Sequence, residues 1–314
     1  MFSGSLVRKL ELLTLILLLS LPVQAGVEKE LRRSFDVVPG GTLELDTERG
    51  SIEVRTHDDS RIDVLVKLES RTGDREDAAK LFERFDVDFE PSGSDLSIEG
   101  RLEGGRALFG WLDSSKLRVK WEVVVPTRYD LDLRTAGGSI GVHDLDGNVV
   151  AKTSGGSLVF GRVLGTVRAR TSGGSIAIEE TGGNVEVSTS GGSITIDSAR
   201  GDVHARTSGG SIKVNEVFGA IDAVTSGGSI KAAISKQPGS DCRLSTSGGS
   251  VTVYLDPSIA VDLDARSSGG RVRADVPITV QGEMGRTRLE GRINGGGPAL
   301  VLRTSGGGIS IRSN

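Results

Sequence analysis

One five-residue motif recurs at a constant spacing, and it constrains the fold more than any other feature of the chain. The motif is T-[SA]-G-G-S, and six copies begin 18 residues apart, at Thr135, Thr153, Thr171, Thr189, Thr207 and Thr225. A second glycine series lies twelve residues after the first five motifs, at Gly147, Gly165, Gly183, Gly201 and Gly219. Two interlocked series with the same period indicate a repeat architecture.

Apolar residues alternate between the glycines of each unit. A typical unit has Ile194 and Ile196 in its first half and Val203 and Ala205 in its second half. Alternation with a period of two predicts short strands with one buried face. A single unit cannot bury its own core, so successive units must stack, with equivalent strands about 4.8 Å apart. The sequence therefore predicts an all-β fold, a single-stranded β-solenoid of ~18-residue coils with two or three sides per coil.

Glycine is expected to shape both corners of the coil. We expect the Gly-Gly pair to adopt positive φ at one corner and the lone glycine to turn the other. Cys242 lies four residues before the motif at Thr246. Val203 lies four residues before the motif at Thr207, so the two residues occupy equivalent positions in their units. This position predicts a small buried hydrophobic residue rather than a reactive thiol.

The motif becomes irregular toward the end of the chain. Later copies begin at Thr246, Ser267 and Thr304, at spacings of 21, 21 and 37 residues. The widest gap contains a Gly- and Arg-rich insertion at residues 281–297. One interpretation is that this insertion folds back over the last coil. We assign residues 135–314 to the regular solenoid.

Residues 26–134 resemble the repeat but differ in composition. Residues 41–54 match the repeat in register, and residues 74–85 predict a helix with Asp74 as its N-cap. Eight of the twelve aromatic residues lie in this region. An open solenoid end exposes sheet edges, so these residues predict a thicker N-terminal β-rich region that starts and caps the solenoid.

The first 25 residues have the pattern of a signal peptide. Arg8 and Lys9 precede an apolar run from Leu12 to Val23, and small residues end at Ala25. Such a run spans only about 18 Å as a helix, less than the ~30 Å of a bilayer core. We predict cleavage before Gly26, export to the periplasm or the cell surface and medium, and no transmembrane anchor in the mature chain.

The charge and the cysteine count exclude several classes of function. The formal net charge is −4, which disfavours nucleic-acid binding. The single cysteine excludes an intramolecular disulfide and a multi-thiolate metal site. His143 and His204 belong to different strands several coils apart, so they cannot share an ion. We expect no cofactor and no metal.

Pairs of acidic residues are candidate catalytic groups, because many β-helical proteins cleave polysaccharides. Asp262 and Asp264 share an outward strand face, and Glu179 and Glu180 are adjacent at a turn. Glycoside hydrolysis needs two carboxylates that face each other across the scissile bond. A convex, solvated surface does not provide this arrangement, so we expect no enzyme and no catalytic residue.

Several segments of the chain together resemble a known family. These are the stacked T-S-G-G-S-I units, P-G-G-T-L-E-L at residues 39–45, V-V-V-P at 123–126 and G-R-I-N-G-G-G-P-A-L at 291–300. They resemble the DUF4097-type family of proteins named as adhesins, over nearly all of the mature chain. The resemblance implies an exported bacterial envelope protein with a β-repeat fold, and it implies no catalytic residue.

Two features are candidate contact sites. Three residues before each motif, outward side chains form a surface charge ladder: Arg168, Glu186, His204, Asp222, Arg243 and Asp264. We favour a role in coil register over a ligand site for this ladder. Phe109 and Trp111 form a candidate contact loop, and we favour the alternative in which they cap the first coil, because every solenoid needs a cap.

Two functional hypotheses remain. In the first, the protein is a non-enzymatic adhesin-like module that binds an envelope or surface macromolecule through its repetitive flank. In the second, it is a scaffold that self-associates by stacking its solenoid ends, as in the cytoskeletal bactofilins that it faintly resembles. The export signal disfavours a cytoskeletal role.

Overall fold

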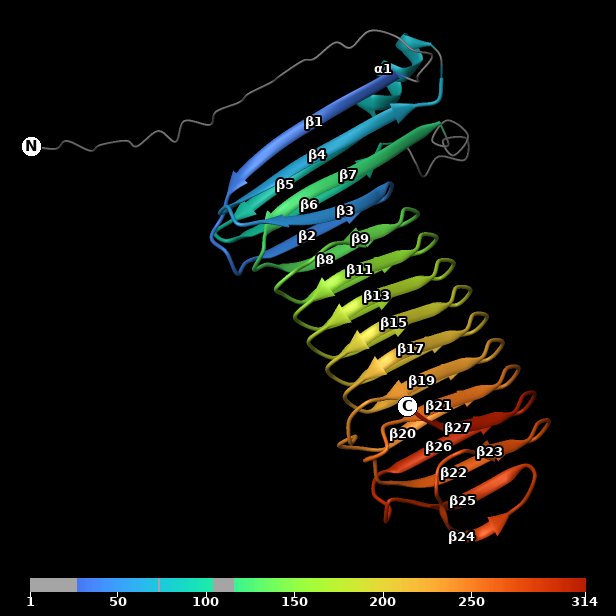
Figure 1. The fold of residues 1–314 in the computed structure, drawn as a ribbon. Helices are drawn as coiled ribbons and strands as arrows, with labels where there is room; N and C mark the ends of the chain where they lie inside the picture. The colour runs from blue at the N-terminus through green and yellow to red at the C-terminus, as the bar shows by residue number, and fades with distance from the viewer. Residues whose placement is uncertain (1–26, 73, 104–115) are drawn as a thin grey trace, which may run out of the picture.

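The 18-residue units form pairs of strands that stack into two facing sheets. The computed structural model describes residues 27–72, 74–103 and 116–314, so the predicted signal peptide lies outside the described residues. Equivalent residues of successive units lie opposite each other in parallel strands, as Ile176 lies beside Ile194 and Val185 beside Val203. Figure 1 shows the resulting stack along the length of the molecule. The β-solenoid prediction is confirmed, and each regular coil has two strands rather than three.

The first sheet, sheet A, begins at the N-terminal end with long strands and continues through the first strand of each unit. Within the described residues it has 13 strands, in the order β1 (Val27–Asp36), β4 (Arg61–Ser70), β7 (Leu117–Pro126), β3 (Ser51–His57), β9 (Ile140–Val142), β11 (Leu158–Val163), β13 (Ile176–Thr181), β15 (Ile194–Ala199), β17 (Ile212–Val217), β19 (Ile230–Ile234), β21 (Val251–Leu255), β27 (Ile309–Ser313) and β23 (Val272–Ala274).

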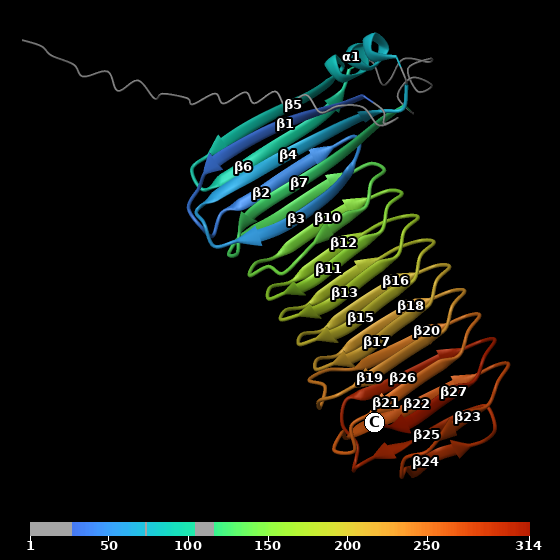
Figure 2. The ribbon, with the colours of Figure 1, turned by 45° about the horizontal axis from the view of Figure 1, so that its top comes forward.

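The second sheet, sheet B, holds the strands that end at the T-S-G-G-S motif, and Figure 2 shows it behind sheet A. Its 14 strands in the described chain, from the C-terminal end of the stack, are β24 (Thr279–Met284), β25 (Arg288–Ile293), β22 (Val261–Ser267), β26 (Ala299–Thr304), β20 (Cys242–Thr246), β18 (Ile221–Thr225), β16 (Val203–Thr207), β14 (Val185–Ser188), β12 (Val167–Arg170), β10 (Val149–Thr153), β8 (Asp130–Thr135), β2 (Thr42–Thr47), β6 (Asp95–Leu102) and β5 (Phe85–Ser92).

The core lies between the sheets and is made by the alternating inward residues. In one coil, Ile194 and Ile196 of sheet A and Val203 and Ala205 of sheet B are all fully buried. Cys242 occupies the same inward column and is 1% exposed, so its predicted role as a small buried hydrophobic residue is confirmed. Burial raises the pKa of its thiol, which keeps the thiol protonated and unreactive.

The glycines of the motif do not act as predicted. Positive φ among the described residues occurs at Gly40, Gly50, Gly93, Asn294, Gly295 and Gly296, none of which belongs to a regular repeat corner. The second motif glycine instead permits close stacking of the coils. A Cβ on Gly192 would lie less than 3.0 Å from the carbonyl oxygen of Gly174 in the preceding coil, whereas one on Gly191 would lie 3.3 Å from that of Gly173.

The motif threonine and serine join neighbouring coils at this corner. The buried hydroxyl of Thr189 donates a hydrogen bond to the carbonyl oxygen of Gly174 at 2.8 Å and accepts one from the Gly192 amide at 3.3 Å. The Ser193 amide donates to the Ser175 hydroxyl at 3.2 Å. The threonine bonds satisfy a buried hydroxyl where the chain reverses direction, and the serine bonds join exposed groups of successive coils, which explains why the sequence repeats Thr and Ser here.

The N-terminal end does not follow the order of the chain. The coil made by β2 and β3 lies between the coil made by β6 and β7 and the first regular coil, made by β8 and β9. Antiparallel strands β1 and β4 extend sheet A, and β5 extends sheet B. The match of residues 41–54 to the repeat is confirmed, because these residues form a complete coil.

A helix and aromatic side chains close this end. Helix α1 (Arg75–Glu83) has Asp74 as its N-cap, as predicted, and its side chain accepts hydrogen bonds from two first-turn amides. The predicted helix extended too far, because Phe85 begins β5. The Phe85 ring packs against Trp121 with centroids 6.2 Å apart, and the Phe35 ring packs against Phe89 at 5.4 Å.

The C-terminal end shows the same exchange of order. The last coil of the chain, β26 and β27, lies between the coil of β20 and β21 and the coil of β22 and β23. The expected order along the sequence is therefore wrong at this end. Strands β24 and β25 span most of the 281–297 insertion and form an antiparallel hairpin, and β25 pairs with β22. The insertion therefore extends sheet B beyond the coil of β22 and β23, and it does not pair with the coil of β26 and β27.

Candidate binding surfaces

The predicted charge ladder follows the outward face of sheet B. Strand pairing places Arg168 beside Glu186, Glu186 beside His204, His204 beside Asp222, and Asp222 beside Arg243. The prediction is wrong for Asp264, because Val301 of the inserted coil lies between it and Arg243. The ladder is therefore continuous over five strands.

Sequence reasoning missed a second row of cations, two residues further along the same strands. Arg170 donates a hydrogen bond to Glu186 at 2.7 Å, while Arg168 lies 3.7 Å from the same carboxylate. Arg206 binds Asp222, with His204 at 3.9 Å from it. The alternation of the strands could have revealed this second row, because residues two apart in a strand lie on the same face of the sheet.

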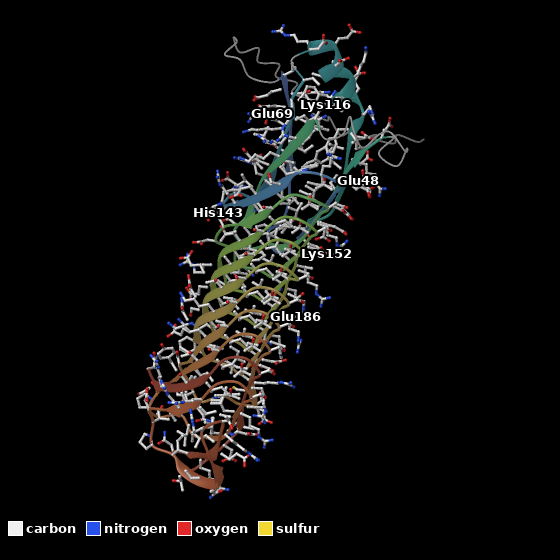
Figure 3. The ribbon with its side chains drawn as sticks, turned by 90° about the vertical axis from the view of Figure 1, so that its right-hand side faces the viewer. Glu48, Glu69, Lys116, His143, Lys152 and Glu186 are labelled. Atoms are coloured by element: carbon white, nitrogen blue, oxygen red, sulfur yellow. The ribbon has the colours of Figure 1, made fainter. Side chains whose placement is uncertain are left out.

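These ion pairs largely neutralise the ladder. The hydrogen bond from Arg170, together with the charges of Arg170, Arg168 and His204, lowers the pKa of Glu186 below its usual value. Figure 3 shows Glu186 and Lys152 on this flank and His143 on the opposite one. Ion pairs in this solvated setting contribute little stability, but they are well placed to hold adjacent coils in register.

Three of the four carboxylates considered for catalysis, Asp262, Asp264 and Glu180, lie in ion pairs. Asp264 binds Arg303 and lies 3.0 Å from Arg266, and Asp262 lies 3.4 Å from Arg292. Glu180 lies 3.7 Å from Arg200. The structure brings none of these carboxylates into an enclosed cleft with a facing carboxylate, among the residues that it describes.

The two histidines considered for metal binding lie on opposite sheets. His143 follows β9 of sheet A and binds Glu53, whereas His204 lies on β16 of sheet B. No group of three or more potential metal-ligating side chains occurs in the described part of the chain. Within the same residues, no helix has both the length and the apolar character needed to cross a bilayer.

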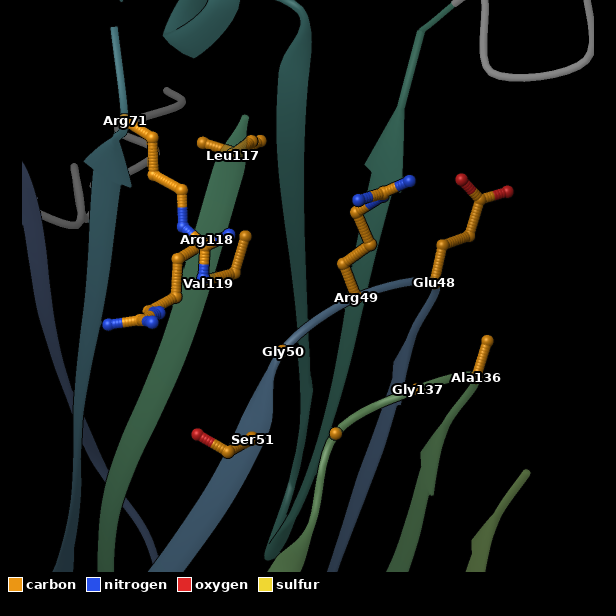
Figure 4. Close-up of a pocket in the computed structure, with 11 residues that line it drawn as sticks. Glu48, Arg49, Gly50, Ser51, Arg71, Leu117, Arg118, Val119, Ala136 and Gly137 are labelled. Atoms are coloured by element: carbon orange, nitrogen blue, oxygen red, sulfur yellow. The ribbon is translucent and has the colours of Figure 1, made fainter. Parts of the chain in front are cut away.

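An open cavity of about 600 Å³ lies near the N-terminal end, where the turn before β3 meets the turn before β9. Arg49, Arg71 and Arg118 line it together with Ser51 (Figure 4). Arg118 lies 3.2 Å from Glu69. The described lining combines the three arginines with the carboxylate of Glu48. Phe109 and Trp111, the predicted contact loop, lie outside the described residues.

A further set of cations, also missed from the sequence, lies on the outward face of sheet A. These exposed side chains lie on the strands of sheet A in the C-terminal half of the stack or directly before one of them: Lys213, Lys231, Arg271, Arg273 and Arg312. A count of the position six residues after each motif begins would have found three of them, Lys213, Lys231 and Arg273. The change in coil order hides the rest, because Arg312 and Arg273 become neighbours only in the folded chain.

Comparison with known proteins identifies one family. The model described as Toastrack DUF4097 matches residues 41–312. No curated protein matches the chain.

Several solved structures resemble the chain at low identity. A "putative lipid binding protein" from Parabacteroides distasonis is 13% identical, with 92% of this chain and 98% of that chain covered and a TM-score of 0.41. A "putative adhesin" from Bacteroides fragilis is 12% identical, with 91% and 97% covered and a TM-score of 0.35. A "putative cell adhesion protein" from Clostridium sporogenes is 13% identical, with 91% and 100% covered and a TM-score of 0.25.

Proposed function

Because the chain belongs to the Toastrack DUF4097 family, we propose that it is a non-enzymatic, exported, adhesin-like protein of the bacterial cell envelope. In this proposal it binds a macromolecule through its long repetitive flank. The proposal needs a leader peptide at residues 1–25, which the sequence pattern supports.

The observation that carries the proposal is the regular spacing of outward side chains along both sheets. Parallel pairing in register repeats equivalent surface positions every ~4.8 Å along the stack. A surface of this kind matches a long partner that also repeats, because contact positions recur at a fixed spacing along the stack. Solenoid proteins commonly bind through such extended surfaces.

The chemistry of the flanks supports binding over catalysis. A glycosidase-type site needs a raised carboxyl pKa and a second carboxylate across a cleft. Asp262, Asp264 and Glu180 instead bind arginines on solvated faces. Such groups can position a partner, but among the described residues they do not face a second carboxylate across a cleft.

The alternative, in which the ends stack into a scaffold, meets unfavourable sheet edges. Edge strand β1 presents charged side chains along its length, and edge strand β5 carries Asp86, Asp88, Glu90 and Pro91. Charge and proline on an edge discourage pairing with a second sheet. Sedimentation at increasing concentration tests this alternative: end-stacking requires the mass to grow, whereas the adhesin proposal expects a constant mass.

The main experiment follows the full chain in a bacterial host. We expect the protein in the exported fraction with Gly26 at its start, and saturable co-sedimentation of the purified protein with insoluble envelope fragments. Full-length protein in the cytoplasm, or an absence of saturable binding over a range of salt concentrations, would contradict the proposal. Release of reducing sugar ends during the incubation would indicate an enzyme instead.

A further inference from the structure

Five exposed cations gather on the outward face of sheet A in the C-terminal half of the stack. Lys213 on β17 lies directly opposite Lys231 on β19, with no residue between them. Arg312 and Arg273 are on the next-to-last and last strands of the sheet, and Arg271 is just before the last strand. We call this set the basic row. It crosses five strands, or about 19 Å at the usual strand spacing.

The basic row is not neutralised within the described chain. None of its five side chains lies within ion-pair distance of a described carboxylate, whereas Arg168, Arg170 and Arg206 on sheet B all do. Like charges directly opposite each other on neighbouring strands are destabilising. The Lys213 and Lys231 pair therefore costs stability that a neutral residue would avoid, in a protein whose net charge is −4.

The residues between these cations are polar and partly exposed. Thr252 and Ser310 occupy the column between Lys231 and Arg273. The Lys231 ammonium lies 5.1 Å from the centre of the Tyr254 ring. Asp275 follows β23 at the rim of the row. Hydroxyl groups and one aromatic face, set among cations, suit a partner that carries both hydroxyls and negative charge.

We propose that the basic row binds an anionic polysaccharide laid along the solenoid axis. The inference rests on the proposed function and names its partner and its surface. A linear chain of acidic sugars presents one carboxylate after another, so it can meet cations that are spread over several strands. A single small anion would need the cations to converge, and here they lie side by side instead.

The composition of the row favours a polysaccharide over a membrane or a protein. The large hydrophobic side chains that are exposed in the described chain are Val38, Val150, Val159, Leu164 and Val280, and none lies on the five strands of the row. Membrane-surface binding normally inserts apolar side chains, and protein interfaces normally bury aromatic or apolar anchors.

The test measures binding of the full-length mature protein to immobilised polygalacturonate, with uncharged dextran as the comparison polymer. The variant is Lys213→Gln with Lys231→Gln, Arg273→Gln and Arg312→Gln. Its matched control also removes four cations, from sheet B: Lys152→Gln with Arg168→Gln, Arg170→Gln and Arg206→Gln. We expect wild type to bind polygalacturonate and not dextran, with affinity that falls as salt rises. We expect the four-residue variant to bind at least about tenfold more weakly and the control to bind as wild type.

Folding is checked by thermal melting, where the variant should match or exceed wild type because the opposed lysines are gone. Equal weakening by the control, equal binding to dextran, or no binding to polygalacturonate would overturn the proposal. Binding to vesicles of anionic phospholipid but not to polygalacturonate would assign the row to membranes. Undiminished binding of the four-residue variant to envelope fragments would overturn this inference and leave the proposed function standing.

Discussion

The regular coils and the two ends of the molecule enclose a similar core by different means. In the coils, neighbouring layers are joined by the same bonds every 18 residues, such as those of Thr189 and Ser193. At the N-terminal end, a helix and the large side chains of Phe85 and Trp121 close the space between the sheets. The difference shows that small inward side chains are enough between stacked coils, whereas the end of the stack needs a helix and large side chains to cover the core.

The two regions also differ in how far along the chain their contacts reach. A regular strand pairs with the strand one unit away, whereas Leu43 of β2 pairs with Leu96 of β6, and Cys242 of β20 pairs with Leu300 of β26. Each end therefore inserts a coil from the chain terminus between two coils that are closer in sequence. Opening an end must break long-range pairing on both sides of the inserted coil, so we infer that this arrangement resists fraying.

The largest expected effect comes from a single methyl group in a regular coil. We expect Gly192→Ala to lower the free energy of unfolding by about 5 kcal/mol or more, because the new Cβ overlaps the Gly174 carbonyl and separates two coils. The matched control is Gly191→Ala, where the nearest atom would be 3.3 Å away, and we expect a loss within about 1 kcal/mol. Denaturant titration measures both. Equal losses would contradict the close-approach explanation.

A smaller effect is expected from an aromatic residue of the N-terminal end. Trp121 is fully buried, and its indole N–H donates a hydrogen bond to the Arg49 carbonyl oxygen at 3.3 Å. We expect Trp121→Ala to cost about 3–4 kcal/mol. Amide hydrogen exchange should accelerate first in β5 and β6 and last in the middle coils.

The control for this prediction is Phe218→Ala, since Phe218 is partly exposed and packs beneath Arg200 in a regular coil. Its loss should be about 1 kcal/mol. If Trp121→Ala accelerated exchange uniformly along the stack, the ends and the coils would form one cooperative unit and the comparison would fail.

A still smaller, pH-dependent effect is expected from the ladder on sheet B. Arg170 lowers the pKa of Glu186 in the folded protein, so the carboxylate stabilises the fold above its unfolded pKa of ~4.3. This contribution is lost as the pH falls through the folded pKa. We expect Glu186→Gln to cost about 0.2–1 kcal/mol at pH 7 and nothing at a low pH where the carboxylate is protonated in the folded protein.

Glu179→Gln serves as the control for Glu186→Gln, because Glu179 is exposed and forms no ion pair with another described residue. Its stability should follow wild type at both pH values. A loss for Glu186→Gln that persisted at low pH would show that the side chain acts by packing rather than by charge.

The smallest effect on stability is expected from a test of coil order at the C-terminal end. Arg243 lies opposite Val301, within the ~4.4–6.8 Å range of Cα separations that a disulfide spans. We expect Arg243→Cys with Val301→Cys to cross-link under oxidation, and the reduced form of this variant to melt at the same temperature as wild type. Arg243 and Asp264 are two strands apart, so Arg243→Cys with Asp264→Cys should remain reduced. Cross-linking of that pair instead would show that these coils stack in the order of the sequence.

Local pattern was enough to predict the coil. The 18-residue period and the alternation of residues such as Ile194 and Ile196 specify strands with one buried face, and stacking is the way such strands bury it. The inward place of Cys242 and the N-cap role of Asp74 followed from the same local rules. The charge ladder was predicted correctly wherever neighbouring coils are also neighbours in sequence.

The sequence by itself thus determined the layer, and the tertiary structure decided which layers touch. Every T-S-G-G-S coil presents similar backbone edges, so the coil of β26 and β27 could pair with several others. Its actual place beside β20 separates Arg243 from Asp264 and brings Arg312 near Arg273. The role of Gly192 also depends on a contact with another coil, because the Gly174 carbonyl oxygen leaves no room for a side chain. Local periodicity constrains the conformation of one unit, whereas neighbours across the stack are selected by the packing of the whole chain.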